Sequence, residues 1–313
     1  MIFDAITFVV ASAIGLAVYP PFIALLRRLR VGQVIQAELP TGHQKKAGIP
    51  TGGGIVFVVL GIVGSVLAAI AGHTGPLPAV AGLILGGLIG FADDRTKLRV
   101  GALGIPARLK LPVQVLLAVP VAALALGEGG AHQMFLPSAM WLLFPLAIIA
   151  VVGTGNAVNI TDGMDGLAGG LSLIAFGTLA VLLPGSQPGE KAVAMGLCGG
   201  LAAFLVFNRY PARVIMGDTG SLGLGFALAA MAIQQGVMVL LPLIGLVFVL
   251  ETLSVIIQVA YFKATGGRRV FKMTPIHYTF HLEGWSENRI ALSFWSAGLV
   301  SALAAVGVAR LYS

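Results

Sequence analysis

Long apolar stretches follow one another along almost the whole chain, separated by short polar segments. Hydrophobic residues make up 58% of the sequence and charged residues only 10%, and the mean hydropathy of +0.97 is far above what a soluble core requires. Lipid cannot pair with backbone polar groups, so long segments without alternation must be helices. The sequence therefore predicts an all-α, polytopic integral membrane protein.

Ten of these stretches approach the roughly 20 apolar residues that a transmembrane helix needs. They are centred near Val10, Val58, Leu85, Leu117, Ile148, Leu173, Leu201, Leu228, Val249 and Ala297. They predict one transmembrane domain over residues 1–313, with functional loops at 27–50, 93–110, 159–168, 208–220 and 263–289. Glycine pairs such as Gly86 and Gly87 suit close helix packing in lipid.

The basic residues are distributed unevenly over the loops. The alternate loops 27–50, 93–110, 208–220 and 263–289 contain 5, 5, 2 and 5 Lys or Arg residues, which is 17 of 19. Because cytoplasmic loops collect Lys and Arg, we expect these loops in the cytoplasm and both termini outside. The net charge of +7 then reflects topology and anionic lipid, and nucleic acid is not an expected partner.

Two adjacent acids and two lysines mark the loop after the third span. Asp93 and Asp94 belong to the segment FADDRTK, in which Lys97 would be their neighbour on a helix. An ion pair that anchors the helix end is the simpler interpretation. Adjacent acids at a membrane surface more often gather a divalent metal or manage a proton. Lys110, at the start of the fourth span, is by itself typical of a lysine that extends toward the membrane surface.

The segment NAVNITDGMDGLAGG, residues 156–170, carries the strongest local signal. Asn159, Asp162 and Asp165 recur every third residue, so a helical turn would place them on one face. Such a row can hold Mg²⁺ through water or hydrogen-bond a ribose and a base. The five aspartates of the loops, completed by Asp218, all fall on the predicted cytoplasmic side.

Asp218 lies in the segment FNRYPARVIMGDTGS, residues 207–221, which leads into the eighth span. It is either a helix N-cap or a carboxylate that places Mg²⁺ against a diphosphate at a helix N-terminus. The acids, bases and glycine-rich turns together favour Mg²⁺-assisted phosphoryl transfer. A transporter would more typically place ionisable groups near the bilayer midplane, where only Glu251 qualifies.

Four segments, taken in order, resemble the polyprenyl-phosphate N-acetylhexosamine-1-phosphate transferases. They are FADDRTK, NAVNITDGMDGLAGG, FNRYPARVIMGDTGS and MTPIHYTFHLEGWSE. With KKAGIPTGGG, residues 45–54, they look most like the phospho-N-acetylmuramoyl-pentapeptide transferases. The resemblance implies Mg²⁺-dependent transfer of phospho-MurNAc-pentapeptide from its UDP carrier to undecaprenyl phosphate, giving lipid I and UMP for peptidoglycan synthesis. It also implies a homodimer in the bacterial inner membrane with a cytoplasmic active site. A UDP-GlcNAc transferase is the nearest alternative, and an ion-coupled transporter a remote one.

The resemblance also implies roles for individual residues. Asp218 matches a metal-binding aspartate that Asn159 assists, and Asp93 and Asp94 match an acid pair that handles the lipid phosphate. Lysines that neutralise phosphates correspond to Lys97 and Lys110, and His277 matches a catalytic histidine that also lines the donor pocket. Further nucleotide-sugar contacts are implied for Lys46, Thr51, Asn159, Asp162, Asp165, Asn208 and Gln258.

This chain departs from the family pattern at two places. Three consecutive histidines are usual where it has His277, Tyr278 and Thr279, and a glutamate is usual where it has His281. Ile215 stands where many members carry an aromatic residue that can stack on uracil. We therefore expect the nucleotide to be held differently in this chain.

Overall fold

The computed structural model describes residues 2–32, 46, 48–70, 72, 76–100, 104–182 and 188–312. Helices account for the regular structure of this part of the chain, apart from one isolated bridge between Gly32 and Pro50, which confirms the all-α expectation. The α-helices are α1 (Ile2–Arg28), α3 (Gly54–Ile70), α4 (Leu77–Val100), α5 (Ala107–Ala125), α6 (Met140–Thr161), α7 (Leu167–Leu182), α8 (Pro188–Asn208), α9 (Gly217–Gln234), α10 (Leu241–Ile244), α11 (Leu246–Ala264), α12 (Ile276–Leu282) and α13 (Glu287–Tyr312), with short turns of other helix types at η1 (Leu126–Gly130) and η2 (Met238–Leu240).

Seven helices of the described chain are long and apolar enough to cross a membrane, namely α1, α4, α5, α6, α8, α11 and α13. The other three predicted spans correspond to α3 and α7, which are shorter apolar helices, and to α9. All residues of α9 are buried in the bundle. A helix that contacts only protein needs no lipid-facing surface, so α9 can carry polar residues and glycines that lower its hydropathy.

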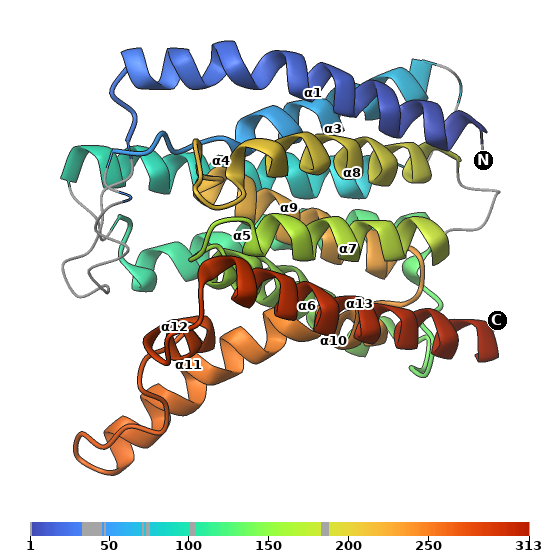
Figure 1. The fold of residues 1–313 in the computed structure, drawn as a ribbon. Coiled ribbons are helices and arrows are strands. Elements are labelled where there is room, and N and C mark those ends of the chain that lie inside the picture. Colours follow the sequence, from blue (N-terminus) through green and yellow to red (C-terminus); the bar gives the residue numbers. More distant parts are fainter. Residues whose placement is uncertain are drawn as a thin grey trace.

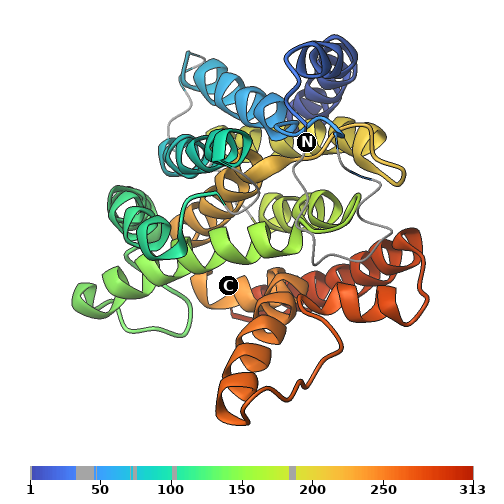
Figure 2. The same ribbon diagram turned by 90° about the vertical axis from the view of Figure 1, so that its left-hand side faces the viewer.

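The helices form one bundle around α9 (Figures 1 and 2). Helix α4 packs along α9 over much of its length, and α6, α3 and α5 also contact it. Helix α11 slants away from the bundle, and α12 lies beside it (Figure 1), with His277 of α12 in contact with Glu251 of α11. Both chain termini lie at the opposite end of the bundle from α12.

A row of glycines lets α4 approach the backbone of α9. Gly82, Gly86 and Gly90 are spaced four residues apart, so they share one face of the helix. A Cβ atom on Gly86 would lie 2.5 Å from the carbonyl oxygen of Leu222, and one on Gly90 would collide with the backbone of Asp218. Small residues give such close contacts where lipid provides no hydrophobic drive. The glycine face therefore sets the distance between α4 and α9.

We predict that Gly86→Ala destabilises the protein, whereas Gly87→Ala is tolerated. The added methyl group at position 86 must displace the α9 backbone, at a cost of about 1–3 kcal/mol. A Cβ at position 87 meets nothing closer than 3.6 Å, and alanine favours a helix over glycine. Thermal unfolding of the detergent-purified variants checks this. Equal midpoints for both variants would contradict close α4–α9 packing.

Candidate active site

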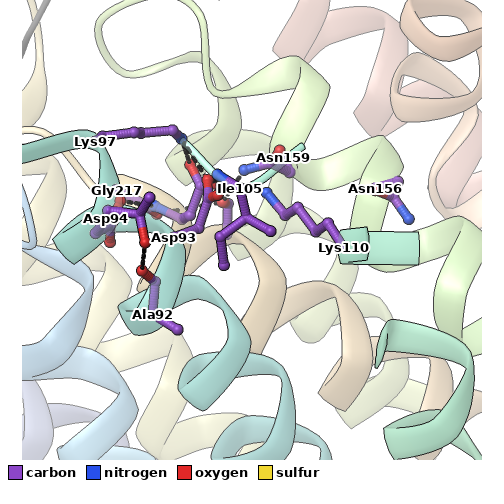
Figure 3. A network of polar contacts seen from close by, with 12 residues as sticks. Ala92, Asp93, Asp94, Lys97, Ile105, Lys110, Asn156, Asn159 and Gly217 are labelled. Carbon is purple, nitrogen blue, oxygen red and sulfur yellow. Dashed lines mark hydrogen bonds and ion pairs between the residues drawn. The ribbon is translucent and has the colours of Figure 1, made fainter. Parts of the chain in front are cut away.

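Two aspartates and two lysines form a charged cluster where α4, α5 and α9 meet (Figure 3). Lys97 Nζ lies 2.9 Å from Asp93 Oδ2 and 2.6 Å from Asp218 Oδ1. Lys110 Nζ lies 3.2 Å from Asp93 Oδ2 and 2.6 Å from Asp218 Oδ2. Each lysine thus bridges both carboxylates, and the four charges balance. We call these four residues the charged cluster.

The cluster is buried on its acidic side and open on one basic side. The side chain of Asp93 is 2% exposed and that of Lys97 31%. Asp93 is held further by its Oδ1 atom, which accepts a hydrogen bond of 2.7 Å from the backbone N–H of Ile105. Lys97 is therefore the member of the cluster that a ligand from solvent can reach most directly.

Asp94 has a different role from its neighbour, because it caps the N-terminus of α9. Its Oδ1 atom accepts a hydrogen bond of 2.9 Å from the N–H of Asp218. Its Oδ2 atom accepts hydrogen bonds from the N–H and the hydroxyl of Thr219, at 2.9 and 2.7 Å. Gly217 precedes them with a φ of 75°, a conformation that favours glycine. The cap of α9 is thus Asp94 of α4, and the carboxylate of Asp218 is left to the lysines.

Asn159 lies beside the charged cluster, whereas Asn156, one turn earlier on α6, lies apart from it (Figure 3). Asn159 Nδ2 donates to the hydroxyl of Ser221 at 2.9 Å, which joins the end of α6 to the first turn of α9. Asn156 instead exchanges hydrogen bonds with Gln114 of α5. Asn159 thus joins α6 to α9 beside the charged cluster, and Asn156 joins α6 to α5.

The turn between α6 and α7 carries Asp162 and Asp165 in opposite surroundings. Asp162 ends α6 and is partly exposed, and its side chain accepts no hydrogen bond from the described residues. Although the residue is partly exposed, burial of its carboxyl group raises the pKa of Asp162 well above its usual range. The carboxylates of Asp218 and Asp94 raise this pKa further. The charges of Asp218 and Asp94 thus act on the carboxyl group of Asp162, and a nearby cation would stabilise its ionised form.

Asp165 instead contacts a buried ion triad. Lys46 Nζ lies 2.7 Å from Asp165 Oδ1 and 2.6 Å from Glu287 Oε2. Asp165 Oδ2 accepts a hydrogen bond of 2.9 Å from the N–H of Ala212, and Asn208 Oδ1 accepts one from the following residue, Gly166. Lys46, Asp165 and Asn208 are therefore brought together, next to the charged cluster rather than within it.

His277 and Gln258 are engaged by the protein itself. His277 is fully buried, and its Nδ1 atom lies 3.0 Å from Oε2 of Glu251 on α11. Its Nε2 atom has no partner in the described structure and faces Gly163 of the α6–α7 turn. Gln258 donates to the carbonyl oxygen of Phe271 and accepts hydrogen bonds from two N–H groups of that loop. Both residues shape the walls of the site.

The residues that replace the usual histidines are also structural. Tyr278 Oη donates to the carbonyl oxygen of Gly163 at 3.3 Å, and burial raises the pKa of the Tyr278 phenol well above its usual range. Thr279 Oγ1 donates to the carbonyl oxygen of Met273 at 2.6 Å. Ile215 is buried, and its N–H donates to Pro50. The side chains of Tyr278 and Thr279 therefore support the turns and loops around the site.

One acid of this region, Glu287, is the last residue of the segment MTPIHYTFHLEGWSE, but the resemblance implies no role for it. An acid in the first turn of a helix is favoured by the helix dipole alone, so its place in α13 is no signal of a site.

Thr51, which the resemblance assigns to the donor pocket, lies close to Gly217, the residue before Asp218 of the charged cluster. A Cβ on Gly217 would be 3.1 Å from Thr51 Oγ1.

The expected metal ligands, Asp218 and Asn159, fit Mg²⁺ under one condition. Carboxylate and amide oxygens suit this hard cation, and Asn159 keeps its amide oxygen for a ligand because its Nδ2 donates to Ser221. Both oxygens of Asp218 accept hydrogen bonds from lysines, and no group of three or more His, Cys, Asp or Glu in the described residues has metal-ligand spacing. A diphosphate would give Lys97 and Lys110 other partners. The residues fit Mg²⁺ bound together with such an anion.

Comparison with known proteins agrees with this geometry. Residues 77–236 match the family described as glycosyl transferase family 4. The chain is 43% identical to the phospho-N-acetylmuramoyl-pentapeptide-transferase of Heliobacterium modesticaldum over 96% of this chain and 95% of that protein. It is 44% identical to the proteins of the same name from Bacillus cytotoxicus and Bacillus thuringiensis, with the same coverage. The matched region contains the charged cluster and its cap, and the chain belongs to the phospho-N-acetylmuramoyl-pentapeptide-transferase family.

Proposed function

We propose that this chain transfers phospho-MurNAc-pentapeptide from UDP-MurNAc-pentapeptide to undecaprenyl phosphate, which yields lipid I and UMP. The observation that most directly supports this proposal is the charged cluster, in which Lys97 and Lys110 each bridge the carboxylates of Asp93 and Asp218. Two ammonium groups held at one point can bind the oxygens of two phosphate groups, one from each substrate. The family membership supports the identity of the substrates.

The acceptor phosphate needs no strong base. Its second pKa is about 6, so it is largely dianionic at neutral pH. An acceptor oxygen forms a bond to the β-phosphorus of the donor as the bond from that phosphorus to the bridging oxygen breaks, and UMP leaves with the electron pair. Lys97 and Lys110 would offset the charge on the phosphates. Mg²⁺, held by Asp218 and Asn159, would supply further charge stabilisation at the diphosphate.

The contacts of the aspartates favour direct attack over a covalent aspartyl-phosphate intermediate. A nucleophilic carboxylate needs an oxygen free to attack. Both oxygens of Asp94 cap α9, and Asp93 is held by Ile105 and the two lysines. Asp93 would orient the lysines, and Asp94 would position Asp218 through the α9 backbone.

The same proposal includes the membrane arrangement. Ten spans, with α3, α7 and α9 completing the seven long helices, would place both termini on one side of the membrane. The position of the termini at the same end of the bundle supports an even number (Figure 1). The charged cluster would then face the cytoplasm of a bacterium, where the soluble donor is found, and the assembly would be a homodimer.

The donor is tested by release of UMP from the purified protein in detergent with Mg²⁺ and undecaprenyl phosphate. We expect release with UDP-MurNAc-pentapeptide and none with UDP-GlcNAc, and chelation of Mg²⁺ should abolish it. Activity with UDP-GlcNAc alone would replace the proposed substrate by the nearest alternative. A folded protein that turns over neither donor would count against transferase activity.

Asp218→Ala should lower the turnover number by roughly a thousandfold or more, because it removes one of the two carboxylates that pair with both lysines and an expected metal ligand. Cys198→Ala is the matched control, since the Cys198 thiol is buried in α8 and makes one weak contact of 3.8 Å to the Leu173 carbonyl oxygen. It should turn over at close to the wild-type rate. An active Asp218→Ala protein would place the metal elsewhere.

Direct attack predicts that the protein stays unmodified when it meets the donor without the acceptor. Intact-mass measurement after incubation with UDP-MurNAc-pentapeptide and Mg²⁺ should show the unmodified mass. An added mass of phospho-MurNAc-pentapeptide, mapped to an aspartate, would establish the covalent route instead.

A further inference from the structure

Glu287 contacts both of the other members of the buried ion triad, which also contact each other. Its Oε2 atom lies 2.6 Å from Lys46 Nζ and also accepts a hydrogen bond of 3.3 Å from the backbone N–H of Asp165. The side chains of Lys46, Asp165 and Glu287 are 10%, 5% and 6% exposed. The first residue of α13 thereby holds a lysine from near the start of the chain and the turn between α6 and α7.

The contacts of this triad continue to the charged cluster. Asp165 accepts a hydrogen bond from the N–H of Ala212. Asn208 accepts one from the N–H of Gly166 and donates one to the carbonyl oxygen of Val214. These three hydrogen bonds fix the segment 208–216, which leads directly into the first turn of α9. Asp162 begins the turn that Asp165 ends, directly after the last residue of α6. A shift of the triad would therefore move Asp162.

The charge of the triad argues against a purely stabilising role for Glu287. Lys46 and Asp165 alone would form a neutral pair, and the second carboxylate gives these three buried side chains a net negative charge. Buried charge without a partner is unfavourable. The presence of the second carboxylate is explained if Lys46 and the α6–α7 turn must be held in fixed positions.

The same charge indicates which substrate the triad serves. A cluster with one excess negative charge repels phosphate, and the reactive headgroup of the lipid acceptor is a phosphate. The nucleotide-sugar donor has neutral polar groups besides its phosphates, and these groups can form hydrogen bonds with the triad. An ammonium group has three N–H donors, and the two carboxylates use two of those of Lys46.

We propose that Glu287 is a positioning residue for the donor, which keeps Lys46 and the α6–α7 turn in the orientation that binds the nucleotide-sugar. This inference rests on the proposed function for the identity of the donor. Glu287 acts through Lys46 and Asp165 and does not touch the reacting atoms.

The test is steady-state kinetics of the full chain with each substrate varied in turn. Glu287→Gln keeps the size of the side chain and removes its charge, so the hydrogen bond from Lys46 weakens. We expect the KM for the donor to rise roughly tenfold, as for loss of a charge-assisted hydrogen bond. The KM for undecaprenyl phosphate and kcat should stay within about twofold. Equal rises of both KM values, or a fall in kcat alone, would overturn the proposal.

Four further variants separate positioning from stability. Glu283→Gln is the matched control, because Glu283 is exposed and pairs with Lys272 at the surface, and its kinetics should be unchanged. If Glu287 acts through Lys46, Lys46→Met and the double variant Lys46→Met/Glu287→Gln should show the same donor KM. Additive rises would contradict this route. If Glu287→Gln does not fold, Glu287→Asp, which retains the charge, takes its place and should show a smaller rise of the same kind.

The proposed substrate and the role of Glu287 can fail separately. Turnover of UDP-MurNAc-pentapeptide by the unaltered protein tests the substrate alone. If only UDP-GlcNAc is turned over, the substrate proposal fails, and the ratio of donor to acceptor KM in Glu287→Gln still decides the role of Glu287 with that donor.

Discussion

A helix that is buried from end to end needs hydrogen-bond acceptors for its first N–H groups inside the protein, and Asp94 supplies them for α9. Protein covers almost all of this N-terminus, so an uncapped end would leave buried donors unpaired. Asp94 can do this because the glycine face of α4 brings the two backbones together. The cap then leaves the carboxylate of Asp218 to Lys97 and Lys110. The charged cluster is thus a consequence of how α9 is terminated.

Hydropathy was sufficient to predict an all-helical protein with several helices long and apolar enough to cross a membrane. Hydropathy and charge could not divide the work between Asp93 and Asp94. Adjacent residues on a helix point about 100° apart, so two neighbours cannot both face one phosphate. That much follows from helix geometry, but which of them meets the N-terminus of α9 depends on the packing of α4 against α9. The hydropathy of α9 could not show that the other helices enclose it, because enclosure depends on how the helices pack.

Partners that are distant in the chain account for the rest of what could not be predicted. Lys46 and Glu287 are 241 positions apart, and no spacing rule connects them. Helical periodicity tells which residues share a face, but it does not tell which other helix that face meets. For the same reason, Gln258 and Asn208 could be recognised as polar residues in a suggestive place, but their bonds to the local backbone could not be foreseen.

The glycine face of α4 has a consequence for turnover. Since the backbones of α4 and α9 are in contact, the site cannot widen along this line without pulling two helices apart, a motion of microseconds or longer. Exchange of bound molecules at this wall would depend on rotation of the lysine side chains, which takes picoseconds to nanoseconds when they are exposed. Slow steps of the catalytic cycle would then have to arise on the other walls, where α11, α12 and the turn after α6 meet.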